Sequence, residues 1–268
     1  MRPDSYSTPA FSAIKAAPAR VYDFYLGGKD NFAADREAGK KVIDAFPAAP
    51  RLARANRGFS LRAVRDCVEA GVEQIIDLGT GIPTSPNVAE IACAANPHVR
   101  VIGVDNDPVV LSHQRAAVSR GGYTIIEGDI RRPWSILADP GFNDVIDLSQ
   151  PVLVLCTAVL HFITEAEEPQ RIITAFTDAI AAGSFLALSA VTSSDTDPTL
   201  IAQIRDAYKD ATAPVIFRTA EHITSWFAGL ELLQPGVASV TQWPGRIGLP
   251  TTLRILGGIA RKPPLRRP

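Results

Sequence analysis

The sequence predicts an α/β fold in which a doubly wound, mostly parallel sheet of seven strands is covered by helices on both faces. Short runs of branched and aromatic residues alternate with segments of helical spacing along most of the chain, as expected for strands joined by crossover helices. With 268 residues, 46% of them hydrophobic, the chain can bury the core that such a sheet needs. A helical cap is expected to precede the sheet.

Seven segments have the short, branched composition of buried strands. The first five are expected to be parallel, and the last two to form a closing pair around Gly245 and Gly248. In chain order the expected strands are residues 74–78, 99–104, 123–126, 152–156, 185–191, 230–240 and 252–260.

Apolar residues at helical spacing predict the helices between these strands. The expected helices are residues 59–70, 85–95, 108–120, 165–182, 198–212 and 219–227. Gly71 suits the left-handed conformation that closes a helix. Asp107 before Pro108 offers a side-chain cap and then proline at the first helical position. Thr164 and Glu167 have the spacing of a capping box.

The N-terminal part of the chain has a different pattern. Residues 19–46 are typical of two helical pieces that are interrupted by the turn-forming run GGKDN at residues 27–31. Three regions are therefore expected. They are a helical cap or lid over residues 1–57, a ligand-binding main domain over residues 58–262, and a basic, proline-rich tail over residues 263–268.

Charge and hydropathy indicate the kind of partner. The 27 basic and 28 acidic residues are mixed along the chain and give a net charge of -1, so neither nucleic acid nor a membrane is expected as a partner. A small molecule is expected instead. No apolar run is long enough to span a membrane, and residues 1–10 lack the pattern of a signal peptide. A cytoplasmic protein is expected, and the sequence does not indicate its oligomeric state.

Cysteine and histidine residues give no sign of a disulfide or a metal site. Each of the three cysteines stands alone among apolar neighbours, as buried, reduced thiols do. The four histidines have no metal-ligand spacing with one another or with the cysteines. No protein-bound metal is expected.

A glycine turn follows the first expected strand, at Asp77-Leu78-Gly79-Thr80-Gly81. Glycines there allow a tight turn and a close approach of the backbone to a ligand. The second and third strands end near Asp105 and Asp129. Because ligands of open α/β sheets bind beyond the carboxyl ends of the strands, the three aspartates are expected around one pocket.

The surroundings of the turn indicate which ligand it binds. The third glycine of the dinucleotide fingerprint is missing, since Thr84 stands in its place after Pro83. Three carboxylates would repel a pyrophosphate, whereas they suit a ligand with a sulfonium, an ammonium and ribose hydroxyls. This combination favours S-adenosylmethionine over NAD.

The chain resembles the class I S-adenosylmethionine-dependent methyltransferases over about residues 72–190, with their Rossmann-like fold. The motifs are IDLGTG (76–81), VD (104–105), EGDI (127–130) and AVLHF (158–162). More narrowly, it is similar to a bacterial family of S-adenosyl methyltransferases with no settled substrate. This similarity covers nearly the whole chain, through ARVYD (19–23), LGGKDNF (26–32), GTGIPT (79–84) and VDNDPVV (104–110).

The resemblance implies a role for each cofactor-binding position. Gly79 and Gly81 would pass under the methionine part, with Asp77 near its ammonium. Asp105 would hold the ribose hydroxyls and Asn106 would lie beside the adenine. The other implied contacts are Asp129 with the exocyclic amine, Ile130 with the adenine ring, and Thr157 and Ala158 with the methionine side. Pro83 replaces a glycine of the wider class and leaves the path of the loop open.

The GGKDN run suggests that the cap is a lid over the cofactor. Tyr22 and Asn31 are expected to contact the cofactor, with Arg20 near its carboxylate. Methyl transfer is an in-line displacement that needs alignment and exclusion of water more than a base. If the acceptor is a hydroxyl, His161 is the first candidate base and Tyr22 the second.

Two other function classes stay open at this point. A non-catalytic protein that binds S-adenosylmethionine would share the cofactor site and differ only at the acceptor side. A nicotinamide-dependent oxidoreductase would share the fold but needs room for a pyrophosphate. O-, N- and C-methylation are all compatible with the sequence.

Overall fold

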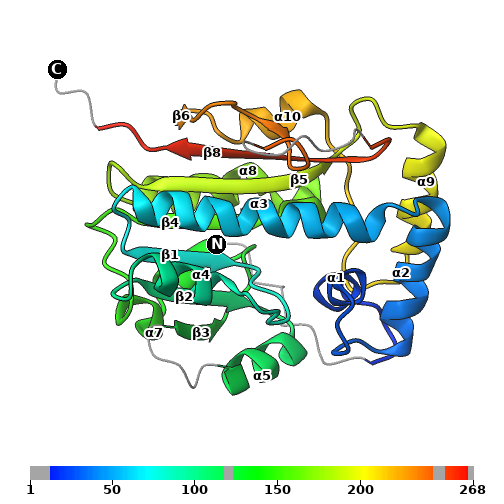
Figure 1. Ribbon diagram of the computed structural model, residues 1–268, viewed down its shortest axis with the longest axis horizontal. Coiled ribbons are helices and arrows are strands. Elements are labelled where there is room, and N and C mark those ends of the chain that lie inside the picture. The colour runs from blue at the N-terminus through cyan, green and yellow to red at the C-terminus, as the bar shows by residue number, and fades with distance from the viewer. Residues whose placement is uncertain (1–12, 118–122, 244–250, 265–268) are drawn as a thin grey trace.

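The computed structural model of the protein describes residues 13–117, 123–243 and 251–264. The residues around Gly245 and Gly248 and the tail beyond residue 264 lie outside the described ranges. Within these ranges the chain forms one twisted sheet with helices on both faces and a helical cap at one end (Figure 1). The predicted α/β, doubly wound fold is therefore confirmed.

The five parallel strands occupy the predicted segments to within one residue at either end. The order across the sheet is β3-β2-β1-β4-β5-β8-β6, and β8 runs antiparallel to β5. The strand bounds are β1 Gln74–Leu78, β2 Arg100–Asp105, β3 Tyr123–Glu127, β4 Leu153–Thr157, β5 Phe185–Thr192, β6 Glu231–Leu232, β7 Ala238–Ser239 and β8 Arg254–Arg261.

Over the residues that the structure describes, the sheet has eight strands, where the sequence predicted seven. The difference lies in residues 230–240, predicted as one strand, which form the two short strands β6 and β7. Both pair with β8. Between them Pro235 lacks a backbone donor and Gly236 has a φ of 86°, so a continuous ladder cannot form there.

Helices cover the two faces in separate groups. Ile75 of β1 packs toward α3 and α4, whereas its neighbour Ile76 packs with α8 and α10 on the other face, since side chains alternate along a strand. The bounds are α3 Ala49–Glu69, α4 Val88–Ala95, α5 Pro108–Ala117, α6 Pro133–Leu137, α7 Pro140–Asn143, α8 Pro169–Ala179, α9 Pro198–Ala207 and α10 Ala220–Ser225.

Several helix ends differ from prediction for local reasons. The helix predicted at 165–182 is a 3-10 turn, η2 (Glu165–Glu167), followed by α8, because Glu168 is left-handed (φ 54°) and Pro169 starts a new helix. The capping box of Thr164 and Glu167 is present. The helices expected at 85–95 and 198–212 start and end inside their predicted ranges.

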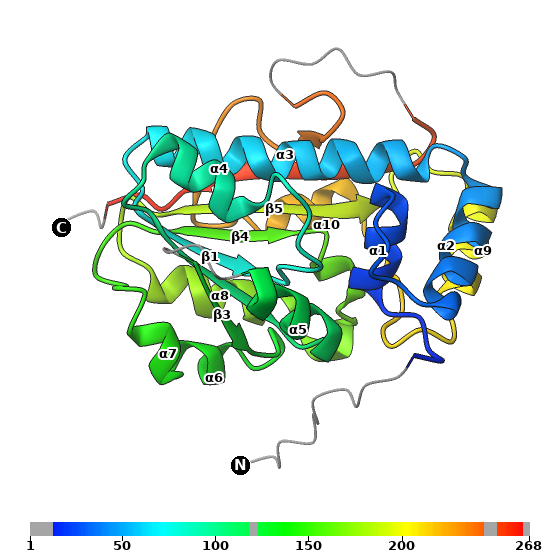
Figure 2. The same ribbon diagram turned by 60° about the horizontal axis from the view of Figure 1, so that its bottom comes forward.

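The cap consists of α1 (Pro18–Leu26), α2 (Ala33–Ala45) and the first half of α3. Figure 2 shows α1 beyond the arrowheads of the parallel strands, with α2 next to α9. The predicted division between residues 57 and 58 falls inside α3. This helix begins ten residues before the expected start at residue 59 and passes without a break from the cap onto the sheet.

Candidate active site

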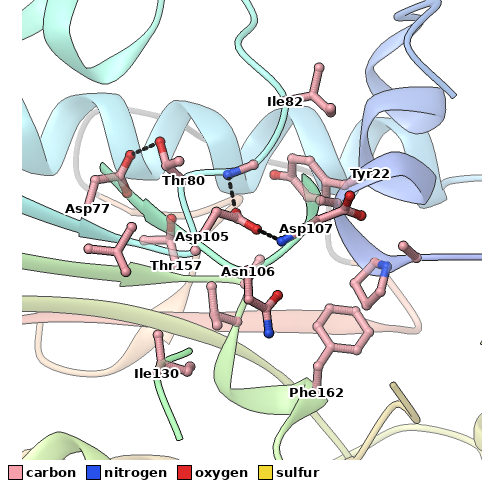
Figure 3. Close-up of a pocket in the computed structure, with 18 of the residues that line it drawn as sticks. Tyr22, Asp77, Thr80, Ile82, Asp105, Asn106, Asp107, Ile130, Thr157 and Phe162 are labelled. Atoms are coloured by element: carbon pink, nitrogen blue, oxygen red, sulfur yellow. Dashed lines mark hydrogen bonds between the residues drawn. The ribbon is translucent and has the colours of Figure 1, made fainter. Parts of the chain in front are cut away.

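A cavity of about 230 Å³ lies where the carboxyl ends of the parallel strands meet the cap (Figure 3). Strand ends contribute Asp77, Asp105, Asp129 and Thr157 to its lining, and α1 contributes Tyr22 from the opposite side. The structure thus brings together the three aspartates that the sequence placed at successive strand ends. This is the position at which ligands bind in open α/β sheets.

The turn after β1 is folded by both of its glycines. Gly79 and Gly81 have φ values of 70° and 69°, which L-residues with side chains rarely adopt. A Cβ atom on Gly79 would lie 2.5 Å from the Val159 side chain, whereas a Cβ on Gly81 would point into open space. The turn therefore packs against the loop after β4 on one side and leaves room for a ligand at Gly81.

Asp77 and Asp105 hold this turn through their carboxylates. Thr80 donates its hydroxyl to Asp77 (2.8 Å), and the backbone N–H of Gly81 donates to Asp105 (3.0 Å). The N–H of Asp107 donates to the other Asp105 oxygen (2.9 Å). Burial raises the pKa of both Asp77 and Asp105 to about 6, because water solvates their charges poorly. A cation in the cavity would favour their ionised forms.

Asp129 is held differently. Arg131 donates from its side chain and its backbone to Asp129 and also pairs with Glu167 (2.8 Å). Burial raises the pKa of Asp129, but the hydrogen bonds from Arg131 outweigh burial and hold the pKa below its usual value. Asn106 and Ile130 also line the cavity, and their expected contacts with adenine stay predictions.

The end of β4 provides Thr157 and Ala158, both of which line the cavity. Ala158 has a φ of 59°, in the left-handed region. Its backbone N–H donates to the carbonyl of Ser189 (3.0 Å) and to the Ser189 hydroxyl (3.1 Å). Neighbouring β5 therefore restrains an uncommon conformation at the cavity wall.

Arg20 lines the cavity, and its guanidinium forms ion pairs with carboxylates of the chain itself. Its Nε lies 3.2 Å from Asp35, its Nη1 lies 3.6 Å from Asp107, and its Nη2 donates to the carbonyl of Lys15 (2.8 Å). The guanidinium is thus matched by two carboxylates, Asp35 of α2 and Asp107 after β2. Its expected contact with the cofactor carboxylate stays a prediction.

Tyr22 lines the cavity as predicted, and its hydroxyl is anchored to α3. It donates to the carbonyl of Ala53 (2.8 Å) and accepts from the Asn56 amide (3.0 Å). Burial raises its pKa to about 12. A phenol in this state keeps its proton near neutral pH, so the candidate role of Tyr22 as a base is not supported.

Asn31 and His161 do not line the cavity. The amide of Asn31 donates to Asp23 (2.8 Å) and so stabilises the loop between α1 and α2. His161 lies in the 3-10 turn η1 (Leu160–Phe162), where burial and then Arg218 lower its pKa to about 3. Neither residue contacts the predicted ligand space. His161 is too weakly basic there to act as the expected base.

Sequence reasoning missed the contribution of α3. The residues of α3 that line the cavity are Asn56, Arg57 and Ser60. The first two precede the helix predicted at residues 59–70, and Ser60 lies in its first turn. A signal was present, because Asn56 and Ser60 are one helical turn apart and share the buried face with apolar residues. Arg57 donates to the carbonyls of Thr84 and Pro86 in the loop after the glycine turn.

Comparison with known families decides the assignment. The model of the S-adenosyl methyltransferase family matches residues 6–263. The chain belongs to this family. The cofactor of this methyltransferase is S-adenosylmethionine, and the Rossmann-like methyltransferase fold predicted from the motifs is confirmed. Among curated proteins, none matches the chain.

Two solved structures are similar to this methyltransferase over almost their whole length. A DUF574 family protein from Streptomyces avermitilis is 36% identical, with a TM-score of 0.88, covering 93% of this chain and 98% of the other. A protein from Thermobifida fusca, provisionally described as a methyltransferase, is 33% identical, with a TM-score of 0.86 and coverage of 93% and 96%. Both therefore share the fold of this chain over almost its whole length.

A more distant structure shares the fold alone. Human N-acetylserotonin methyltransferase, solved in complex with S-adenosylmethionine, is 14% identical, with a TM-score of 0.52, covering 91% of this chain and 70% of the other.

Within the described residues of this methyltransferase, no helix is long and apolar enough to cross a membrane.

The cavity fits the cofactor on its own chemistry. Asp77 and Asp105 are buried carboxylates whose pKa values are raised by burial, and a cationic ligand beside them would favour their ionised forms. The glycine turn provides backbone at close range and open space above Gly81. Asp77 and Asp105, which suit an ammonium and ribose hydroxyls, therefore both contact the glycine turn, whose backbone the ligand can approach.

Proposed function

We propose that this methyltransferase transfers a methyl group from S-adenosylmethionine to a small-molecule acceptor. The observation that carries the proposal is the pair of buried carboxylates, Asp77 and Asp105, beside the glycine turn inside a cavity that α1 covers. When bound, S-adenosylmethionine supplies an electrophilic methyl group. The role of the chain is to orient cofactor and acceptor and to exclude water.

We assign each part of the cofactor to particular residues of the cavity. Asp77 takes the ammonium, Asp105 the ribose hydroxyls, and Asp129, Asn106 and Ile130 the adenine. This assignment follows the order of the neighbouring strands β1, β2 and β3 in the sheet. Thr157 and Ala158 line the methionine side. We expect no protein-bound metal to take part, and we expect the protein to act in the cytoplasm.

Arg57 completes the methionine end. It lines the cavity, and the charge of Asp77 acts on it. Burial lowers its pKa, and its described hydrogen bonds go to backbone carbonyls and not to a carboxylate. The methionine part of the cofactor carries an ammonium and a carboxylate. We assign the ammonium to Asp77 and the carboxylate to Arg57, in place of Arg20.

Replacing Arg57 by glutamine is expected to weaken binding of S-adenosylmethionine roughly tenfold, because one charge-assisted hydrogen bond is lost. Isothermal titration calorimetry measures the affinity, and Arg54→Gln, an exposed arginine one turn earlier on α3, is the matched control. Decarboxylated S-adenosylmethionine should bind the wild type and Arg57→Gln equally well. A tenfold difference for that ligand too would show that Arg57 does not bind the carboxylate.

Methyl transfer itself is tested with cofactor labelled in its methyl group and a bacterial extract as the source of acceptors. Label is expected in the small-molecule fraction, and Asp105→Asn protein should give none. Label in protein or nucleic acid instead would contradict a small acceptor. Tight binding of the cofactor without any labelled product would support the non-catalytic alternative, which shares the cofactor site.

A further inference from the structure

A chain of hydrogen bonds connects the end of β4 to the cap. It starts at the backbone N–H of Ala158, which donates to the Ser189 hydroxyl (3.1 Å). Ser189 donates to the Asn56 carbonyl oxygen (2.5 Å), and the Asn56 amide donates to the Tyr22 hydroxyl (3.0 Å). Tyr22 donates to the carbonyl of Ala53 (2.8 Å). The chain therefore crosses from β4 through β5 and α3 to α1.

Both ends of this chain fix its direction. The Ala158 N–H can only donate and the Ala53 carbonyl can only accept, so each hydroxyl between them accepts on one side and donates on the other. Asn56 fits because its amide has an acceptor and a donor on the same group. Asn56 is 2% exposed and Ser189 is fully buried, so a polar group that loses its partner there has little access to water.

Ala158 is the point at which this chain reaches the ligand space. It lines the cavity in the left-handed conformation, which alanine adopts far less readily than glycine. The restraint comes from Ser189, whose carbonyl and hydroxyl both accept the Ala158 N–H. Tyr22, at the other end, lines the cavity from the cap.

We infer that Asn56 and Ser189 are positioning residues that hold the strand-end backbone at Ala158 and the cap residue Tyr22 in one arrangement around the bound ligand. The inference rests on the proposed function in taking S-adenosylmethionine as that ligand. Asn56 connects two walls of the cavity that belong to different parts of the fold. Cofactor affinity is therefore expected to depend on Ser189, although this β5 residue does not itself line the cavity.

The chain offers a matched control for Ser189. Ser184 also belongs to the β4–β5 region, is fully buried, and accepts a backbone N–H from Val152 (3.1 Å). It lies at the other end of these strands, away from the cavity. Ser189→Ala and Ser184→Ala thus each remove a buried hydroxyl that accepts a backbone N–H, at the ligand end and at the far end of the sheet, and Ser189→Ala also removes the donor to Asn56.

The test is calorimetric titration of the full chain with S-adenosylhomocysteine, with thermal unfolding of each variant recorded alongside. Ser189→Ala is expected to bind about fivefold more weakly than the wild type, because the hydroxyl that accepts from Ala158 and donates to Asn56 is lost. Ser184→Ala is expected to bind like the wild type even if its midpoint of unfolding falls equally. Equal affinities of the two variants would overturn the inference.

Glycine at position 158 supplies a rescue that a merely structural role of Ser189 would not show. Ala158→Gly combined with Ser189→Ala is expected to recover most of the lost affinity, because glycine adopts the left-handed conformation without restraint. Tyr22→Phe with Ser189→Ala should cost less than the product of the single losses, since either change interrupts the same chain. No rescue, or strictly multiplicative losses, would refute the coupling.

Failure of the inference and failure of the proposed function can be told apart. If the wild type does not bind S-adenosylhomocysteine or S-adenosylmethionine at all, the proposed function fails first. If the wild type binds and Ser189→Ala binds equally well, only the positioning role of Ser189 and Asn56 fails.

Discussion

Replacing Asp105 by asparagine is expected to weaken binding of S-adenosylmethionine at least about a hundredfold, because two charge-assisted hydrogen bonds to the ribose are lost or misdirected. Both Asp105 oxygens also accept backbone N–H groups, from Gly81 and Asp107. An amide has one acceptor oxygen, so its NH₂ group must face one of these donors. Calorimetric titration of wild type and variant measures the difference.

The fold is expected to survive this substitution. Burial raises the pKa of Asp105 to about 6, so ionising this carboxyl near neutral pH costs the unliganded fold free energy that an asparagine does not. Glu127→Gln is the matched control, since Glu127 is the exposed residue in register with Asp105 on β3. Wild-type affinity in Asp105→Asn, or a loss of similar size in Glu127→Gln, would contradict the ribose assignment.

Cofactor affinity is expected to fall as the pH is lowered through 6. Asp77 and Asp105 have pKa values raised to about 6 by burial, and only their ionised forms attract a cationic ligand. Protonation of one of them between pH 7 and pH 5 predicts about a tenfold loss, and protonation of both up to about a hundredfold. Titrations with S-adenosylmethionine at pH 5, 6 and 7 measure the slope.

The same shifts predict the opposite trend for the unliganded protein. A carboxyl whose pKa is higher in the folded than in the unfolded state stabilises the fold below about pH 4, and this contribution is lost as the pH rises through 6. These two groups therefore lower stability at pH 7, and S-adenosylmethionine should raise the midpoint of thermal unfolding more at pH 7 than at pH 5. An affinity that does not change between pH 5 and pH 7 would contradict the role of the carboxylates.

Most of the cofactor end of the cavity could be predicted from the sequence. The glycine turn and the aspartates follow strands whose composition is clear, and a parallel sheet brings successive strand ends to one edge. Asp77, Asp105 and Asp129 therefore converge whatever the details of the loops. The positions of β1 to β5 could also be predicted, because buried parallel strands are continuous apolar runs in the sequence.

The cap side could not be predicted in the same way. The role expected for Arg20 assumed that its charge was available, and its partners Asp35 and Asp107 come from α2 and from the loop after β2. Their proximity depends on how the helices pack, which spacing along the chain does not show. The position of His161 depends on the 3-10 turn η1, in which its side chain is buried and is not part of the cavity lining.

α3 carries a consequence for how the protein folds. Its 21 residues extend about 30 Å, and one end packs against α1 while the other packs against β4, β5 and β8. Neither part has a complete hydrophobic surface without this helix, since the cluster that contains Phe59 and Val64 also contains Val21 and Ile75. Cap and sheet should therefore melt as one cooperative unit, and relatives could not exchange one for the other without rebuilding the shared helix.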